Sequence, residues 1–249
     1  MEIIPFIFIS KPYESLVLEK YVPKSKRNAF LFHISYDCKP KSIHKIYTIL
    51  GIKLKFKKVI LWLPTFRNSK ALNRNDSTFN FPLGIPIIYS KEDLNLINDY
   101  LNKLNVCLLL KLHPAQDTSV FKLDSLTNII IINDKYLIDR NIELCELYKV
   151  TDAMITDYSS VYVDYLLLNK PLGFTQDDFE QYKKGFSMPN INDYMPGHKI
   201  MNVDDLKKFI SDISSNIDNY KEERERVNKI FNKFNDSKSS ERLAKYLDL

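Results

Sequence analysis

Short apolar runs recur along the middle of the chain, separated by longer amphipathic stretches. Four runs are almost uniformly apolar: Lys58 to Leu63, Val106 to Leu112, Asn128 to Ile132 and Ala153 to Thr156. Runs of this kind are typical of strands that are covered on both faces, as in a parallel sheet. A fifth segment, Pro171 to Thr175, indicates one more strand end that leads into a loop.

The intervening stretches are long enough for crossover helices. Lys91 to Leu104, Asn141 to Val150 and Ser159 to Leu168 carry apolar residues at helical spacing. This order predicts an α/β fold with a Rossmann-like parallel sheet. From Val203 the pattern becomes helical only, with helices expected over Val203 to Ser215 and Asn219 to Phe234.

Two regions have weaker patterns. Residues 65 to 90 form a long connection rich in Asn and Ser, and connections of this length are often functional or mobile. The opening MEIIPFIFIS lacks the features of a signal peptide, so we expect a buried strand there. We expect residues 1 to 50 to form a short N-terminal extension packed on a main domain of residues 51 to 249.

Composition narrows the class of protein. The 249 residues are 45% hydrophobic and 27% charged, which is typical of a globular chain and excludes a disordered one. The net charge of +5 suits anionic ligands, but acidic and basic residues are interleaved, which argues against nucleic-acid binding. No apolar run reaches the ~20 residues of a membrane span.

Several chemistries have no motif support. The sequence contains no GxSxG, GxGxxG, GxxxxGK[ST] or HExxH pattern, which leaves serine hydrolase, dinucleotide oxidoreductase, P-loop and zincin functions unsupported. No acidic cluster has the spacing of metal ligands, so the sequence identifies no metal-binding residues and no cofactor, and it leaves a requirement for a divalent metal open.

Polar residues follow the predicted strands, where ligands bind in open parallel sheets. Thr65 and Arg67 come after the first strand and offer a hydroxyl and a guanidinium to a phosphate oxygen; a turn with a surface Arg is the alternative. His113 ends the next strand, and Pro114 keeps it out of helical geometry. We interpret His113 as a donor to a phosphate or a leaving group.

The segment Thr156 to Ser160 is the most specific feature. Ser159 and Ser160 would begin a helix, and their hydroxyls with the free N–H groups would form a diphosphate site. The alternative is that they only cap the helix. Asp164 returns to the same face, where its carboxylate could accept hydrogen bonds from a ribose diol, and Asp157 is expected to orient the loop.

A last polar region contains two glycines and adjacent basic residues. It comprises Lys183 to Phe186 and Tyr194 to Gly197. Such a loop could close over a ligand, and an ordinary surface loop is the alternative.

In order, the segments KVILWLPTFR, KLHPAQD, DAMITDYSSVYVDYLLLNKPLGF, KKGF and MPG resemble the CDP-glycerol glycerophosphotransferase family, the teichoic-acid and capsule polymerases. The likeness runs from about Lys57 to the C-terminus. It implies a GT-B architecture of two Rossmann-like domains, of which this chain supplies the C-terminal, donor-binding half.

The resemblance also implies roles for individual residues. The donor diphosphate would be surrounded by Thr65, Arg67, His113, Ser159 and Ser160. Asp164 would lie nearer the nucleotide, and Lys184 replaces the family's usual Arg, which keeps the charge but loses the bidentate fork. An acceptor hydroxyl would attack the β-phosphorus while His113 neutralises or protonates the departing CMP.

The function implied is transfer of glycerol phosphate, or a related alditol phosphate, from a CDP-activated donor to a teichoic-acid-like or capsular polymer. The expected partners are CDP-glycerol as substrate, a lipid-linked polymer acceptor and no nucleic acid. The expected location is the cytoplasm or the inner face of the plasma membrane.

Three alternatives stay open. Residues 1 to 50 contain no counterpart of the family's acceptor-side His motif, so one alternative is that a partner chain supplies the acceptor domain. Without it, the chain would be a non-catalytic or truncated nucleotide-binding half. A CMP-sugar-dependent glycosyltransferase is the other enzyme class, because an HP motif and a serine pair can also serve that donor.

Overall fold

The computed structural model describes residues 56–65, 67–69, 74–79, 81–112, 126–183 and 190–234, with positions 48, 50, 236, 238, 241, 242 and 245. His113, Lys184 and the opening MEIIPFIFIS therefore lie outside the described residues. The chain divides into two compact units, one of residues 41–231 and one of residues 1–40 with 232–249. In the second unit Arg242 forms an ion pair with Asp236 and stacks over Phe234.

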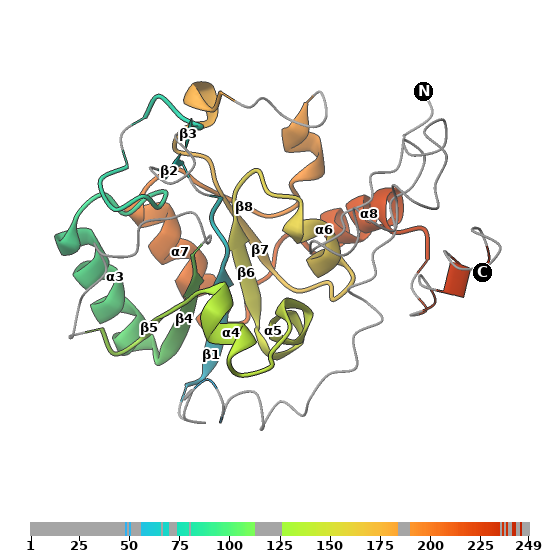
Figure 1. Ribbon diagram of the computed structural model, residues 1–249, viewed down its shortest axis with the longest axis horizontal. Coiled ribbons are helices and arrows are strands. Elements are labelled where there is room, and N and C mark those ends of the chain that lie inside the picture. Colours follow the sequence, from blue (N-terminus) through green and yellow to red (C-terminus); the bar gives the residue numbers. More distant parts are fainter. Residues whose placement is uncertain are drawn as a thin grey trace. The chain divides into compact units, whose positions relative to one another are not determined.

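The larger unit is built on a six-stranded sheet in the order β5-β4-β1-β6-β7-β8, in which every neighbouring pair is parallel (Figure 1). The strands are β1 (Lys58–Trp62), β4 (Val106–Lys111), β5 (Ile129–Ile132), β6 (Ala153–Thr156), β7 (Leu172–Thr175) and β8 (His198–Ile200). The predicted α/β class and five predicted strands are confirmed. β8 was not predicted, because its three residues, HKI, contain no apolar run.

Helices cover both faces of the sheet. They are α3 (Lys91–Leu104), α4 (Asp134–Ile138), α5 (Leu144–Val150), α6 (Val161–Leu166), α7 (Val203–Ser214) and α8 (Lys221–Phe231), with short 3-10 helices η4 (Phe179–Gln181) and η5 (Ile191–Tyr194). β1 alternates between two cores: Ile60 and Trp62 pack with α3 and α7, and Leu61 packs in the core that includes residues of α5, α6 and α8.

The ends of α3 show how local sequence sets a boundary. Ser90 accepts a hydrogen bond from the Asp93 amide, and the Asp93 carboxylate accepts one from the Ser90 amide, which together form a capping box. Asn105 ends the helix in the left-handed conformation, at φ 55°. The predicted helix and the observed one therefore have the same bounds.

Several short elements differ from those that the sequence pattern predicts. α4 is five residues long, too short for a periodic pattern. α5 begins at Leu144, later than predicted, because Glu143 and Glu146 form a capping box there. The long connection contains a small antiparallel pair, β2 (Asn68–Ser69) with β3 (Arg74–Asn75).

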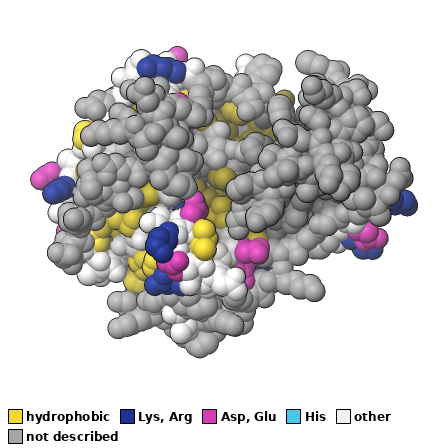
Figure 2. Space-filling model, in the orientation of Figure 1, with side chains coloured by type: hydrophobic (Ala, Val, Ile, Leu, Met, Phe, Trp, Pro, Cys, Tyr) yellow, Lys and Arg dark blue, Asp and Glu magenta, His cyan; other side chains and the backbone are white. Residues whose placement is uncertain are grey.

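The surface shows mixed charge. On the face drawn in Figure 2, dark-blue and magenta side chains of the described residues lie close to one another and do not gather in separate patches. Among these residues there is also no helix long and apolar enough to cross a membrane.

Candidate functional site

The strand order defines one position in the sheet that favours ligand binding. From β1 the chain proceeds outward through β4 to β5, and it then returns to β6 and proceeds the other way through β7 to β8. β1 and β6 are therefore neighbours at the point where the direction reverses, and ligands bind outside the carboxyl ends of strands at such a point. Thr65 and Arg67 follow β1 there, and Asp157 to Ser160 follow β6.

Asp157 connects these two turns and is fully buried. Its Oδ2 accepts hydrogen bonds from the Thr65 amide at 2.9 Å, the Thr65 hydroxyl at 2.7 Å and Arg67 Nη1 at 2.8 Å. Its Oδ1 accepts one from the Ser159 amide at 3.3 Å. One carboxylate therefore fixes the turn after β1 against the start of the serine turn.

Arg67 lies next to Asp157 and is buried, with only 1% of its surface exposed. Nε and Nη2 donate to the two oxygens of Asp178 at 2.7 and 3.1 Å, and Nη1 donates to Asp157. Burial disfavours the charged guanidinium, but the two carboxylates outweigh it and raise the pKa of Arg67 above its ordinary value. The hydrogen bonds of the Arg67 guanidinium go to these carboxylates and to Thr65, and its contact with a diphosphate stays a prediction.

Aromatic rings surround the guanidinium. The Arg67 Cζ atom lies 5.2 Å from the ring centroids of Tyr158 and Tyr182 and 5.7 Å from that of Phe81. The rings of Tyr158 and Tyr182 are themselves 4.5 Å apart. These rings exclude water from the ion pairs, which strengthens the electrostatic interactions within them.

Backbone pairing attaches the long connection to the segment after β7. Ser77 forms a β-bridge with Tyr182, and the Lys183 amide donates to the Asp76 carbonyl at 2.9 Å. The Asp76 amide in turn donates to the Arg67 carbonyl at 2.8 Å. These backbone hydrogen bonds therefore attach the long connection of residues 65 to 90 both to Arg67 and to the segment after β7.

The serine pair lies at the start of α6. Ser160 is the N-cap residue, yet its side chain makes no capping hydrogen bond, while the Ser159 hydroxyl accepts a long one, 3.4 Å, from the Val161 amide. Both serines are half-buried. Capping therefore does not account for the Ser160 hydroxyl.

The other predicted site residues are placed less directly. Asp164 lies near Tyr148, whose pKa is raised first by burial and then by that carboxylate. Lys111, two residues before His113, forms an ion pair of 2.6 Å with Asp134 at the start of α4. His113 and Lys184 lie outside the described residues, so their roles stay predictions.

Part of the predicted closing loop belongs to the scaffold. A Cβ atom on Gly197 would lie 2.2 Å from the carbonyl oxygen of Leu172, and His198 pairs with Gly173 in the register of β7 and β8. Gly197 therefore lies at the amino ends of these strands, at the edge of the sheet opposite Thr65 and Asp157. Its closing over a ligand at the carboxyl edge is not compatible with this position.

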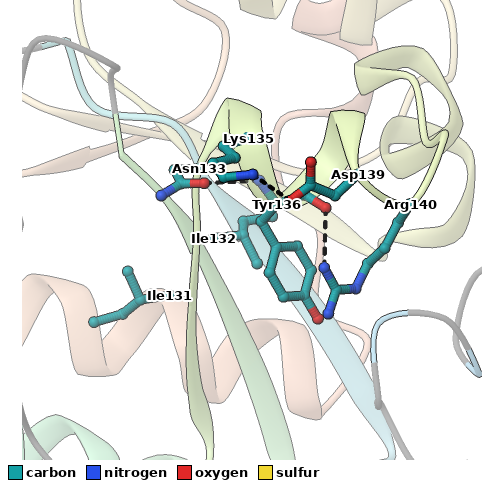
Figure 3. Close-up of a pocket in the computed structure, with 7 residues that line it drawn as sticks. All are labelled: Ile131, Ile132, Asn133, Lys135, Tyr136, Asp139 and Arg140. Carbon is teal, nitrogen blue, oxygen red and sulfur yellow. Dashed lines mark hydrogen bonds and ion pairs between the residues drawn. The ribbon is translucent and has the colours of Figure 1, made fainter.

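A pocket of about 330 Å³ opens where β5 passes into α4, also at the carboxyl edge of the sheet (Figure 3). Tyr136 and Arg140 lie side by side in it, with the guanidinium 3.6 Å from the ring centroid, and Lys135 forms an ion pair with Asp139. The lining residues are Ile131, Ile132, Asn133, Lys135, Tyr136, Asp139 and Arg140.

Sequence reasoning missed Asp178 and Tyr182. Asp178 follows the carboxyl end of β7, so the rule that led to Thr65 and Asp157 would also have indicated it. Tyr182 had no such signal, because its position depends on the β-bridge to Ser77.

Comparison with known proteins agrees with this fold and assigns the chain to a family. The family model of CDP-glycerol:poly(glycerophosphate) glycerophosphotransferase matches residues 27–248. The chain belongs to this family, which confirms the resemblance carried by the motifs.

Curated relatives are teichoic acid enzymes. The teichoic acid ribitol-phosphate primase of Bacillus spizizenii is 31% identical over 197 residues, which are 78% of this chain and 45% of that protein. The teichoic acid glycerol-phosphate transferase of Staphylococcus aureus is 28% identical over 221 residues, 88% of this chain and 51% of that protein. The chain thus spans about half the length of these two relatives.

A solved structure has the same fold. The wall teichoic acid polymerase TagF aligns with a TM-score of 0.57 at 25% identity, covering 83% of this chain and 46% of that one. A variant of TagF with CDPG aligns with a TM-score of 0.61 at 21% identity, covering 95% of this chain and 54% of that one. The expected Rossmann-like half of a GT-B fold is therefore confirmed.

Proposed function

We propose that this chain binds CDP-glycerol, or a related CDP-alditol, at the carboxyl ends of β1 and β6 and serves in transfer of the alditol phosphate to a teichoic-acid-like polymer. One observation carries this proposal: Asp157 joins the turn of Thr65 and Arg67 to the turn of Ser159 and Ser160. Membership of the glycerophosphotransferase family supports the choice of donor.

In the proposed complex, the donor diphosphate accepts hydrogen bonds from the hydroxyls of Ser159 and Ser160 and from amides at the start of α6. Charged acceptors form stronger hydrogen bonds than neutral ones, and amides with no intrahelical partner favour an anion. Asp157 attaches this turn to Thr65 and Arg67, which are the further predicted contacts of the diphosphate. Lys184 adds positive charge, and Asp164 accepts from the ribose hydroxyls.

The proposed chemistry is a single displacement. The acceptor hydroxyl oxygen forms a bond to the β-phosphorus, the bond from that phosphorus to the bridging oxygen breaks, and CMP leaves with the electron pair. His113 donates a proton to CMP or neutralises it, while the acceptor's own proton passes to a base. Positioning and charge stabilisation supply most of the catalysis in such a transfer.

The acceptor in this proposal is a polymer held on lipid, which brings the chain to the inner face of the plasma membrane. Because the chain spans about half the length of the teichoic acid relatives, a further domain or a partner chain supplies the acceptor side. CDP-alditol is a substrate in this scheme, and the proposal includes no cofactor.

Calorimetric titration of the whole chain with CDP-glycerol tests the donor site. We expect micromolar binding, and a double Ser159→Ala, Ser160→Ala variant should weaken it at least about 100-fold, because two hydrogen bonds to a charged group are worth about 3 kcal/mol or more. Exposed Ser215 provides the matched control, and Ser215→Ala should leave the affinity unchanged.

Further arms separate the alternatives. His113→Ala should weaken binding of CDP-glycerol, and Tyr136→Ala shows whether the donor extends into the pocket of Figure 3. Binding of a CMP-sugar in preference to CDP-glycerol would favour the other transferase class. Absence of CDP-glycerol binding by the folded chain would refute the proposed donor site.

A further inference from the structure

Asp178 joins three neighbouring strand ends through one buried carboxylate. It lies after β7, is 0% exposed, and both of its oxygens accept hydrogen bonds. Besides Arg67 from the turn after β1, Tyr158 from the turn after β6 donates its hydroxyl to Oδ1 at 3.0 Å. Among the described residues, Asp157 and Asp178 are the two carboxylates shown to accept hydrogen bonds from both of these turns.

The contact to Tyr158 acts on the residue beside the serine pair. The Tyr158 ring packs against the ring of Phe179 at 5.9 Å and that of Tyr182 at 4.5 Å, both from the segment after β7. The hydroxyl is held at one end by Asp178, and the backbone at the other end continues directly into Ser159. The ring therefore connects the segment after β7 to the serine turn.

The buried ion pair between Arg67 and Asp178 keeps the connection between the segment after β7 and the serine turn rigid. A buried carboxylate that loses its partner keeps its desolvation cost, so Arg67 and Asp178 do not separate readily. Arg67 also bonds Asp157, whose Oδ1 accepts from the Ser159 amide. The serine turn is thus held from two directions, by Asp157 at its backbone and by Asp178 through Tyr158.

We propose that Asp178 is a positioning residue for the donor diphosphate, which fixes the Ser159–Ser160 turn through Tyr158 and Arg67. This inference rests on the proposed donor site. A purely structural ion pair would stabilise the fold without affecting the geometry of the serine turn, and that is the alternative to be tested.

Tyr158→Phe is the decisive variant, because it removes the bond to Asp178 while the buried Arg67–Asp178 pair stays in place. Tyr162→Phe is the matched control: Tyr162 is a buried tyrosine of α6 that packs edge-on against Phe174. Asp178→Asn is the second variant, which keeps the shape of the side chain and removes its charge.

Two measurements are made on each variant. Hydrogen exchange is followed by mass spectrometry on peptides that contain residues 157–161, with peptides from β4 as the reference. CDP-glycerol affinity is measured by calorimetry. For Tyr158→Phe we expect faster exchange in residues 157–161, unchanged exchange in β4, and about a fivefold loss of affinity, while Tyr162→Phe changes neither.

Each outcome decides the inference. Unchanged exchange at the serine turn and unchanged affinity in Tyr158→Phe would overturn it, as would equal effects in Tyr162→Phe. If the wild-type chain does not bind CDP-glycerol, the proposed function fails, and the exchange measurement alone still shows whether Tyr158 and Asp178 fix the turn. If Asp178→Asn does not fold, the comparison of Tyr158→Phe with Tyr162→Phe is sufficient to test the inference.

Discussion

Substitution of Gly197 tests the close packing of the segment before β8 against the backbone of β7. A methyl group at this position would lie 2.2 Å from the carbonyl oxygen of Leu172 and 2.8 Å from its carbonyl carbon. Both are backbone atoms of β7, which cannot rotate away, so either the sheet or the segment must shift. If the segment were a loop closing over a ligand, alanine would be tolerated there.

Gly173 provides the comparison within the same pair of strands. Its added methyl group would meet Cδ1 of Ile200 at 2.8 Å, the far end of a flexible side chain, and the ring of Phe209 at 3.4 Å. Overpacking in cores costs about 1–3 kcal/mol. We place Gly197→Ala near the upper end, about 3 kcal/mol, and Gly173→Ala near the lower end, about 1 kcal/mol.

Thermal unfolding followed by circular dichroism measures the difference. For a chain of this size each kcal/mol shifts the melting temperature by about 2–4 °C, so Gly197→Ala should lower it by about 6–12 °C and Gly173→Ala by about 2–4 °C. Urea unfolding checks the free energies, with equal slopes expected. A melting temperature of Gly197→Ala equal to that of the wild type, or above that of Gly173→Ala, would refute the packing described here.

Further predictions concern a helix cap, a helix end and a histidine. Ser90→Ala should destabilise the chain by about 1 kcal/mol in urea unfolding, because the Asp93 amide loses its acceptor; an unchanged midpoint would contradict the capping box. Asn105→Gly should be neutral or stabilising and Asn105→Ala destabilising by about 1 kcal/mol, since φ is 55° there, and the reverse order would contradict that conformation. Burial lowers the pKa of His198 below its ordinary 6.5, against the opposing effect of Asp212, so the folded state binds the proton less tightly than the unfolded state. Its contribution to stability is present above pH 6.5 and is lost as the pH falls below it, and His198→Gln should remove this part of the pH dependence of unfolding.

Local sequence predicted the elements that have a long or uniform pattern. The runs that became β1, β4, β5, β6 and β7 are apolar because both faces of a parallel sheet are covered, and this requirement is visible without coordinates. The bounds of α3 follow from its own capping residues. By contrast, α4 and β8 are too short for any periodicity, and only packing on the sheet shows them.

For the candidate site, too, the sequence predicted some features and the tertiary structure decided the others. Because side chains that follow parallel strands gather at the carboxyl edge, the sequence alone determined that Thr65, Arg67 and Asp157 to Ser160 belong to that edge, and their order identified the family. The partners of these residues were decided by the tertiary structure. Arg67 and Asp178 are 111 positions apart and meet because β1 and β7 both lie next to β6. Such a contact depends on strand order and register, which are set by the crossover connections and by packing across the whole sheet, so no local pattern encodes it.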